Sequence, residues 1–211
     1  RVPAYREVGR EEFGDHRFQI AHSVTSVEQL AATLGGLVDP AFLDDVRAGM
    51  RRAPMNVRLS PYVIGLIDWT RPYADPLRTQ FLPVASRLRA DHPRLSLDSL
   101  HERRDSPTPG LVHRYPDKAL FLADGVCPVY CRFCTRSYAI GGDTATVAKV
   151  TYAPDPARWN RAFAYLLSRP EIEDVVVSGG DAYFLSPGNL RRIGETLLAI
   201  PHVRRIRFAS K

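Results

Sequence analysis

Strand-like and helix-like segments alternate over the C-terminal half of the chain, and this alternation restricts the possible fold more than any other feature. Short apolar runs typical of strands lie at 119–123, 174–177 and 204–209. Segments with helical periodicity lie between them at 155–168 and 186–200. Strands that alternate with helices indicate a parallel sheet with right-handed crossovers, so we predict an α/β fold. Functional groups in such sheets lie at the carboxyl ends of the strands.

Short helices are predicted in the N-terminal half. Ser26 and Gln29 form a capping box, S-x-x-Q, ahead of a helix that ends at Gly35-Gly36. Three more helices are expected to begin where Asp or Ser precedes proline, at Asp39-Pro40, Ser60-Pro61 and Asp75-Pro76. The sequence therefore predicts a helical region ahead of the α/β part.

A proline-rich segment separates these two parts. Three prolines fall within residues 105–116, which we interpret as a linker laid over a surface. We therefore expect a helical region and linker at 1–110 and an α/β region at 111–211.

All three cysteines, Cys127, Cys131 and Cys134, lie within eight residues in the spacing C-x3-C-x2-C. An odd, clustered set argues against a secreted disulfide framework and indicates a metal or redox site in a reducing compartment. Zinc would need a fourth protein ligand, whereas an iron–sulfur cubane held by three thiolates leaves one iron open to a small-molecule ligand. The alternatives are a zinc site and three buried cysteines that pack as small apolar residues.

The charge and hydropathy of the chain indicate a soluble protein. There are 29 Lys+Arg against 23 Asp+Glu, for a net charge of +6, but the basic residues are scattered, so we expect no nucleic-acid partner. No apolar stretch reaches about 18 residues and the N-terminus is polar, so we expect no membrane span and a cytoplasmic location.

The motif C-P-V-Y-C-R-F-C resembles the signature of radical S-adenosylmethionine (SAM) enzymes. Longer segments, at 105–122, at D-V-V-V-S-G-G-D-A and at I-P-H-V-R-R-I-R, are similar to lysine 2,3-aminomutase and its relatives. The resemblance covers nearly the whole chain and implies that 111–211 is the first half of a radical SAM partial (β/α)6 barrel with parallel strands. It also implies an isomerase that moves an amino group between C2 and C3 of an amino acid, foremost L-lysine to give β-lysine. The cofactors it implies are a 4Fe–4S cluster, SAM and pyridoxal 5′-phosphate (PLP).

The same resemblance implies which residues hold the cluster and SAM. The three cysteines of the motif would ligate the 4Fe–4S cluster. A second element, S-G-G-D, would bind the amino group of SAM, since two glycines allow a close approach and a carboxylate pairs with an ammonium group. Its residues are Ser178, Gly179, Gly180 and Asp181.

Residues for PLP and the substrate are implied in the same way. Arg114 matches a contact to the PLP phosphate and Tyr115 matches the ring beside the cofactor. Lys118 stands where the family usually has a second phosphate-binding arginine, and lysine keeps the charge but loses the bidentate geometry. Arg136 matches the residue that pairs with the substrate carboxylate. We assign Arg132, between two cysteines, only a local electrostatic effect.

Some residues of the family have no match here. We expect no catalytic residue in this chain, because the lysine that forms the Schiff base with PLP is expected beyond Lys211. Three parallel strands would also leave an open sheet edge, so we expect a part of a longer protein that is inactive alone. Alternatives are another amino-acid substrate (glutamate, arginine or protein-bound lysine), a radical SAM enzyme without PLP, and a zinc-stabilised basic binding module. The expected partners are a small-molecule amino acid, a reductant protein such as flavodoxin or ferredoxin, and further copies of the chain in a homo-oligomer.

A few other residues carry structural predictions. Tyr138 and Gly141-Gly142 are predicted to form a mobile loop beyond the cysteines. His113 is expected to make a structural hydrogen bond, and Trp69 and Trp159 are expected to lie in the core.

Overall fold

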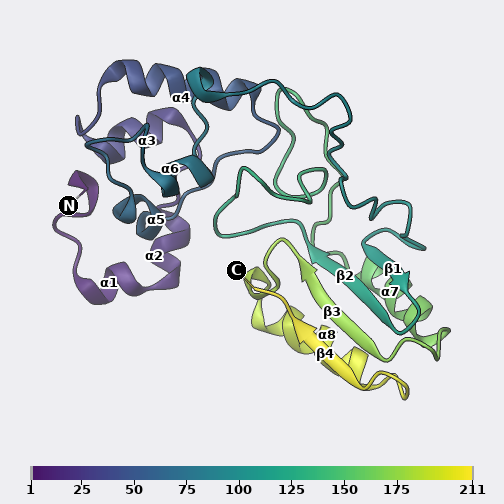
Figure 1. The fold of residues 1–211 in the computed structure, drawn as a ribbon. Coiled ribbons are helices and arrows are strands. Elements are labelled where there is room, and N and C mark those ends of the chain that lie inside the picture. Colours follow the sequence, from purple (N-terminus) through teal and green to yellow (C-terminus); the bar gives the residue numbers. More distant parts are fainter. Residues whose placement is uncertain (1, 211) are drawn as a thin grey trace. The chain divides into compact units, whose positions relative to one another are not determined.

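The computed structural model describes residues 2–210, which divide into two compact units (Figure 1). The helical unit consists of Arg1–Leu95, Pro128–Ser137 and Gly142–Ala148. The sheet unit consists of Ser96–Cys127, Tyr138–Gly141 and Lys149–Lys211. None of the helices in residues 2–210 has the length and apolar character needed to cross a lipid bilayer.

The helical unit contains six short α-helices and two 3-10 turns among the described residues. The helices are α1 (Arg10–Gly14), α2 (His16–Ala21), α3 (Val27–Leu34), α4 (Pro40–Arg52), α5 (Pro61–Leu66) and α6 (Pro76–Phe81). The turns are η1 (Pro3–Tyr5) and η2 (Ala85–Arg87). The sequence did not predict α1 and α2.

All four predicted helix starts are confirmed. Ser26 and Gln29 form the reciprocal capping box of α3, and Gly35 ends that helix in the left-handed conformation, at φ 53°. The side chains of Asp39, Ser60 and Asp75 each accept a backbone N–H in the first turn of their helices. These bonds join residues two or three positions apart, so local sequence is enough to define them. The unit's core includes Leu30, Leu34, Phe42, Val46, Leu59, Ile64 and Trp69.

The sheet unit contains one four-stranded sheet in the order β1-β2-β3-β4 (Figure 1). Its strands are β1 (Leu111–Tyr115), β2 (Lys118–Asp124), β3 (Asp174–Gly179) and β4 (Arg205–Phe208). The helices α7 (Pro156–Leu167) and α8 (Pro187–Leu198) connect the last three strands, and the turn η3 (Ala182–Phe184) follows β3. The predicted strand, helix, strand, helix, strand order is confirmed, and β2, β3 and β4 are parallel.

The first strand corrects two predictions. Residues 105–116 were expected to form a linker, but 111–115 form β1, which pairs antiparallel with β2. The linker prediction is therefore wrong from Leu111 onward, and the sheet is mixed rather than wholly parallel. The pairing places Leu111 opposite Phe121 and Tyr115 opposite Lys118, so a tight turn at Pro116 joins the strands.

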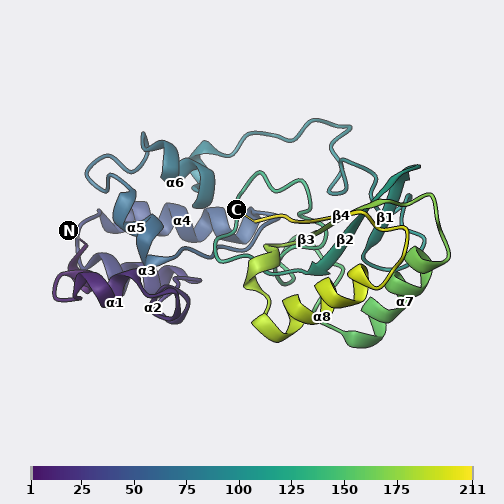
Figure 2. The same cartoon turned by 90° about the horizontal axis from the view of Figure 1, so that it is seen from below.

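Helices α7 and α8 cover one face of the sheet (Figure 2). Alternate side chains of a strand point to opposite faces. Phe121 of β2 and Val175 and Val177 of β3 pack with the helices, whose Trp159 and Ile193 are fully buried. The next residues in each strand, including Leu120 and Val176, therefore face the other side of the sheet.

The segment after the cysteines also differs from its prediction. Tyr138, Ala139 and Ile140 are buried, at 4%, 2% and 2% exposure, and belong to the sheet unit. The Tyr138 hydroxyl donates to the Glu102 carboxylate at 3.0 Å. The predicted mobile loop is therefore wrong at Tyr138, whereas the predicted core positions of Trp69 and Trp159 are confirmed.

Candidate functional site

The turn after β3 lies directly beside the segment that leads from β2 to the cysteines. The Gly180 N–H donates to the Asp124 carbonyl at 2.7 Å, and the Asp181 N–H donates to the Val126 carbonyl at 2.9 Å. Val126 immediately precedes Cys127. The structure thus brings the S-G-G-D element and the start of the cysteine motif together at the carboxyl edge of the sheet.

The two glycines of this element are required by that close approach. A Cβ atom at Gly179 would lie 1.9 Å from the Asp124 carbonyl oxygen, and one at Gly180 would lie 2.1 Å from that of Val126. Gly179 also has φ +131°, a conformation that side chains disfavour. The resemblance implies that these glycines allow a close approach of SAM, and in the structure they also make room for a neighbouring stretch of backbone.

Asp181 and Ser178 are both buried, at 5% exposure. The Asp181 carboxylate accepts the Tyr183 N–H at 3.0 Å and the Ser210 hydroxyl at 3.1 Å. Ser210 follows β4, so the ends of all three parallel strands contribute to this rim. These bonds fix the orientation of a carboxylate that can attract an ammonium group.

Asp124, the last residue of β2, is a polar residue of the rim that the sequence analysis missed. It is 3% exposed, and its carboxylate accepts the Gly125 N–H at 2.6 Å. Burial raises the pKa of Asp124, while the backbone bonds to Gly125 and Val126 and the Arg158 charge lower it by less. Its position at the end of an apolar strand, directly before a glycine, was the signal available in the sequence.

The cysteine motif begins in the sheet unit with Cys127 and continues in the helical unit with Cys131 and Cys134. All three are thiols, partly exposed, and none is in a disulfide. Cys131 packs against the core of the helical unit. Among residues 2–210, no three His, Cys, Asp or Glu side chains are grouped as a metal site, so the cluster stays a prediction from the spacing.

Within the helical unit, the backbone around Cys131 is fixed by neighbours on both sides. The Tyr130 N–H donates to the Arg58 carbonyl at 3.1 Å, and the Arg132 N–H donates to the Gln80 carbonyl at 2.9 Å. The Arg132 guanidinium donates to the Thr79 carbonyl at 2.8 Å, and burial lowers its pKa. Arg132 therefore anchors the loop to α6, which is more than the electrostatic effect that we had assigned to it.

The residues expected to bind PLP line one small cavity of about 170 Å³ on the sheet face opposite α7 and α8. The cavity walls include Glu102, Arg114, Tyr115, Lys118, Leu120 and Val176. The Lys118 ammonium lies 5.9 Å from the centre of the Tyr115 ring and donates to Asp117 at 2.8 Å. The structure thus brings together the two cations and the aromatic ring, with the buried Glu102 beside them.

Arg114 is oriented by two acceptors from the preceding segment. Its Nε donates to Asp105 at 2.6 Å, and one Nη donates to the Leu100 carbonyl. The Arg114 bond holds the pKa of Asp105 below its usual value. A guanidinium carries five N–H donors, so these contacts leave donors for an anion in the cavity.

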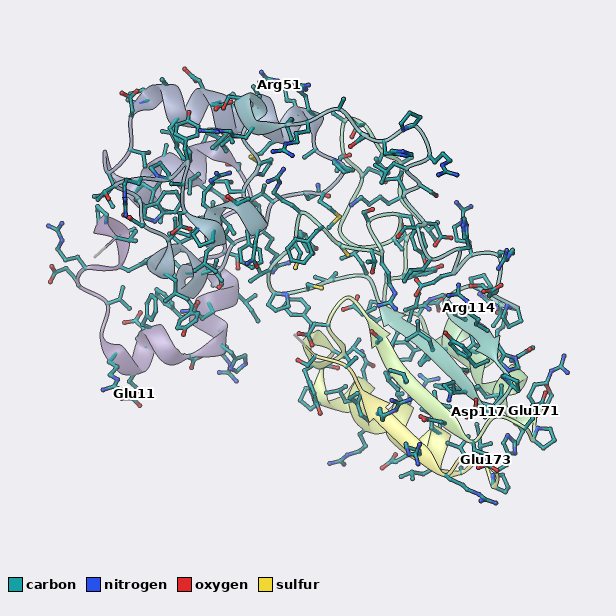
Figure 3. All side chains as sticks on the ribbon, viewed as in Figure 1. Glu11, Arg51, Arg114, Asp117, Glu171 and Glu173 are labelled. Carbon is teal, nitrogen blue, oxygen red and sulfur yellow. The ribbon has the colours of Figure 1, made fainter. Side chains whose placement is uncertain are left out.

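The cavity and the rim lie at opposite ends of β2. Lys118 is the first residue of this strand and Asp124 is the last, a separation of about 20 Å of extended chain. Figure 3 shows Asp117 and Glu173 close together at the amino ends of β2 and β3, with Arg114 of β1 apart from them. The face of the sheet that carries the cavity is partly covered, since Tyr138, Ala139 and Tyr152 form a buried cluster with Val112 and Leu122.

Two other residues, Arg136 and His113, complete the comparison with the predictions, and Lys149 makes a further contact. Arg136 is partly exposed and lies in the segment 128–137 of the helical unit. His113 forms the expected structural hydrogen bond, with its Nδ1 2.9 Å from the Tyr165 hydroxyl. The Lys149 ammonium donates to the Ile140 carbonyl at 2.7 Å.

Comparison with known proteins gives a consistent result, although no family model matches the chain. L-lysine 2,3-aminomutase of Bacillus subtilis is 33% identical over 210 residues, which cover 100% of this chain and 42% of that protein. L-lysine 2,3-aminomutase of Fusobacterium nucleatum is 35% identical over 209 residues, 98% of this chain and 46% of that protein. Glutamate 2,3-aminomutase of Clostridioides difficile is 26% identical over 202 residues, 95% of this chain and 44% of that protein. The chain spans less than half the length of these relatives, and by this similarity it belongs to the lysine 2,3-aminomutase family.

Proposed function

We propose that the protein is a radical SAM, PLP-dependent amino-acid 2,3-aminomutase, with L-lysine as its substrate and β-lysine as its product. The single observation that carries this proposal is the rim, where the S-G-G-D element is hydrogen-bonded to the residues just before Cys127. A turn that binds SAM must lie beside the loop that binds the cluster, because the open iron and the Asp181 carboxylate would bind the same ligand.

The donor chemistry of the chain fits the three cofactors. Three thiols suit a cluster with one open iron, and the oriented Asp181 carboxylate suits the SAM ammonium group. Arg114 and Lys118 beside a small cavity suit a phosphate, and Tyr115 offers a ring face for a pyridine. When bound, the reduced cluster and SAM supply hydrogen-atom abstraction, and PLP supplies covalent activation of the substrate amine.

The chain's own residues would bind and orient these groups rather than make bonds. The Arg114 guanidinium would hold an anion at the amino end of β2, and Asp181 would hold a cation at the carboxyl end. Arg136 would supply a charge for the substrate carboxylate. A one-electron donor, such as flavodoxin or ferredoxin, would be needed to reduce the cluster.

Lysine is favoured as the substrate because the relatives at 33% identity and above carry that name, whereas the glutamate enzyme is 26% identical. Glutamate is the second candidate on the same comparison. Anaerobic incubation of the intact protein with SAM, PLP, a reductant and each amino acid would distinguish them. Formation of β-lysine, detected by NMR, supports the first assignment, and β-glutamate alone would replace it with the second.

The metal site is tested by anaerobic purification and metal analysis. We expect a brown protein with about four iron and four sulfide, and loss of most of this content when Cys127, Cys131 or Cys134 is replaced by alanine. A colourless protein that holds zinc in proportion to the same cysteines would refute the cluster and favour a zinc-stabilised binding module.

The SAM assignment has a matched control in the chain. Asp143 follows Gly141-Gly142 and so repeats the G-G-D sequence, but it lies in the helical unit. We expect D181N to weaken SAM binding to the reconstituted protein at least about tenfold and D143N to leave it unchanged, measured by calorimetry. Equal affinity in wild type and D181N would remove Asp181 from the SAM site.

The phosphate assignment is tested in the same way. R114Q should weaken PLP binding, followed by absorbance, whereas R104Q, at a side chain that is 76% exposed, should not. K118R should strengthen PLP binding, because a planar fork replaces a single point charge. PLP affinity that is unaffected by R114Q would separate PLP from this cavity.

A further inference from the structure

Two side chains of α7 hold the end of β2 from which the cysteine motif begins. The Arg158 guanidinium donates to the Leu122 carbonyl at 2.7 Å and to the Ala123 carbonyl at 2.9 Å. The Trp159 indole N–H donates to the same Ala123 carbonyl at 3.0 Å. Both side chains are buried, at 5% and 0% exposure. The direction in which the chain leaves β2 is therefore determined by side-chain contacts from α7.

The Leu122 carbonyl needs such a partner because β1 begins only at Leu111, opposite Phe121, and does not extend beside Leu122. The Leu122 N–H donates to the Gly110 carbonyl at 2.7 Å, and the N–H and carbonyl of one strand residue point to the same side. Gly110 has φ +82°, so the chain turns away before it reaches the Leu122 carbonyl. Arg158 occupies this place, since a Cβ atom at Gly110 would lie 2.1 Å from its Nη1.

The Arg158 charge is held in the interior by dipoles. Every acceptor that it reaches in the described chain is a carbonyl oxygen, and the further ones belong to Tyr152 and Ala153, at 3.5 and 3.2 Å. Its guanidinium also lies 5.2 Å from the centre of the Tyr152 ring, and its Nε is buried without a hydrogen-bond partner. Burial lowers its pKa, and the carboxylates of Asp155 and Asp124 act on it only by Coulombic attraction. Arginine remains charged even when buried, so a positive charge is fixed there.

The Arg158 charge contacts the backbone four residues before the first cysteine. Ala123 and Cys127 are four residues apart, so their Cα atoms are separated by at most about 14 Å. A charge buried in the protein is screened less than one in water, and the potential of an iron–sulfur cluster depends on nearby charges and hydrogen bonds. A positive charge stabilises the more negative, reduced state of a cluster.

We infer that Arg158 is a positioning residue for the cluster, which with Trp159 fixes the strand end ahead of Cys127 and by its charge raises the cluster's reduction potential. This inference rests on the proposed function, since it requires a cluster at the cysteines. Helix α7, which lies on the opposite face of the sheet from the cavity, would therefore influence the reduction potential of the cluster.

The test compares four forms of the intact protein, reconstituted anaerobically with iron and sulfide. R158Q removes the charge, R158K keeps it, and R161Q removes an exposed charge from the same helix. Redox titration followed by EPR should give R158Q a more negative midpoint potential than wild type. R158K and R161Q should keep the wild-type value. A wild-type potential in R158Q would overturn the electrostatic part of the inference.

The positioning part has a separate measurement that needs no cluster. Hydrogen–deuterium exchange should show faster uptake at residues 122–127 in R158K and in W159F, which lacks the indole donor, and unchanged uptake in R161Q. Unchanged uptake in both R158K and W159F would overturn this part. Wild-type protein that binds no iron and sulfide would refute the proposed function instead, and the exchange measurement would still decide whether α7 fixes the strand end.

Discussion

The helical unit and the sheet unit are specified by contacts of different range. Each predicted helix of the helical unit begins at a side chain that bonds a backbone N–H two or three residues ahead. Its long-range side-chain bonds, such as those from the Ser86 N–H to Asp45 and from the Thr146 hydroxyl to the Ala53 carbonyl, are exposed or partly buried. In the sheet unit, buried bonds join residues 36 positions apart, as between Arg158 and Leu122 and between Tyr138 and Glu102.

This difference predicts in which unit a substitution should lower the free energy of unfolding most. A local cap contributes about 1 kcal/mol, and the rest of the helix remains packed when it is lost. A buried long-range contact joins segments that are far apart in the sequence, and removing it leaves an unpaired polar group in the interior. The sheet unit should therefore be the more sensitive of the two.

The largest effect is expected for Gly179→Ala at the rim. The new methyl group would overlap the Asp124 carbonyl oxygen, and the φ of +131° disfavours any side chain. We expect a loss of more than about 4 kcal/mol in the free energy of unfolding, or failure to fold. Urea denaturation followed by circular dichroism measures it.

Gly194→Ala in α8 is the matched control for this substitution. Nothing lies within 4 Å of its added Cβ, so alanine should stabilise the helix by about 0.5–1 kcal/mol. A Gly179→Ala protein as stable as wild type would mean that the two backbone segments are not packed as the structure has them.

The next effect is expected for Tyr138→Phe, also in the sheet unit. Its hydroxyl donates to the buried Glu102 carboxylate, and burial together with that carboxylate raises the pKa of Tyr138, so it remains a donor at neutral pH. We expect a loss of about 2 kcal/mol, because hydrogen bonds to charged groups contribute more than neutral ones. Tyr183→Phe, at a side chain that is 62% exposed, should change stability by less than about 0.5 kcal/mol. Equal effects of the two substitutions would contradict the buried bond.

Tyr138 also illustrates which parts of the fold could be predicted. The helix starts were predicted correctly because a cap and its N–H lie within one turn of sequence. Tyr138 was assigned to a mobile loop because its partner, Glu102, lies 36 residues upstream. Strand β1 was missed for the same reason, since prolines flank it and only its pairing with β2 makes it a strand.

The candidate site divides in a similar way. The meeting of S-G-G-D with the approach to Cys127 was expected, because parallel strands end at one edge of a sheet. The roles of Asp124 and Arg158 were not, since each depends on which backbone groups the fold places beside it. The predicted strand at 119–123 already placed Lys118 at its amino end, but the sequence did not indicate that Arg114 lies beside this strand, because that follows from the antiparallel pairing of β1.

A smaller effect is expected at the helix caps, where one cap from each unit can be compared directly. Ser26→Ala in α3 and Ser186→Ala in α8 each remove a cap whose oxygen accepts an N–H three residues ahead. We expect each to lose about 1 kcal/mol in the free energy of unfolding, since the backbone N–H of Ser26 that donates to the Gln29 side chain is kept in alanine. Similar losses would show that local signals count equally in both units. A Ser26→Ala loss larger than that of Tyr138→Phe would reverse the order of sensitivity that we propose.

The smallest effect is expected for Asp124→Asn, because asparagine keeps the volume and the acceptor for the Gly125 N–H and removes only the ionisation. Burial raises the pKa of Asp124 in the folded state, so between the ordinary value of about 3.9 and that raised value the folded protein binds more protons than the unfolded chain. The free energy of unfolding contributed by this group therefore falls as the pH rises through that window.

Contributions from other carboxylates cancel in the difference between variant and wild type. Urea titrations at a series of pH values should show Asp124→Asn gaining stability relative to wild type as the pH rises through the window, and then a constant difference. A flat difference would mean that burial does not shift this pKa, and a difference that declines with pH would mean that the rim stabilises the carboxylate. In the second case the sheet unit would resemble the helical unit, where the pKa of the partly exposed Asp45 is lowered.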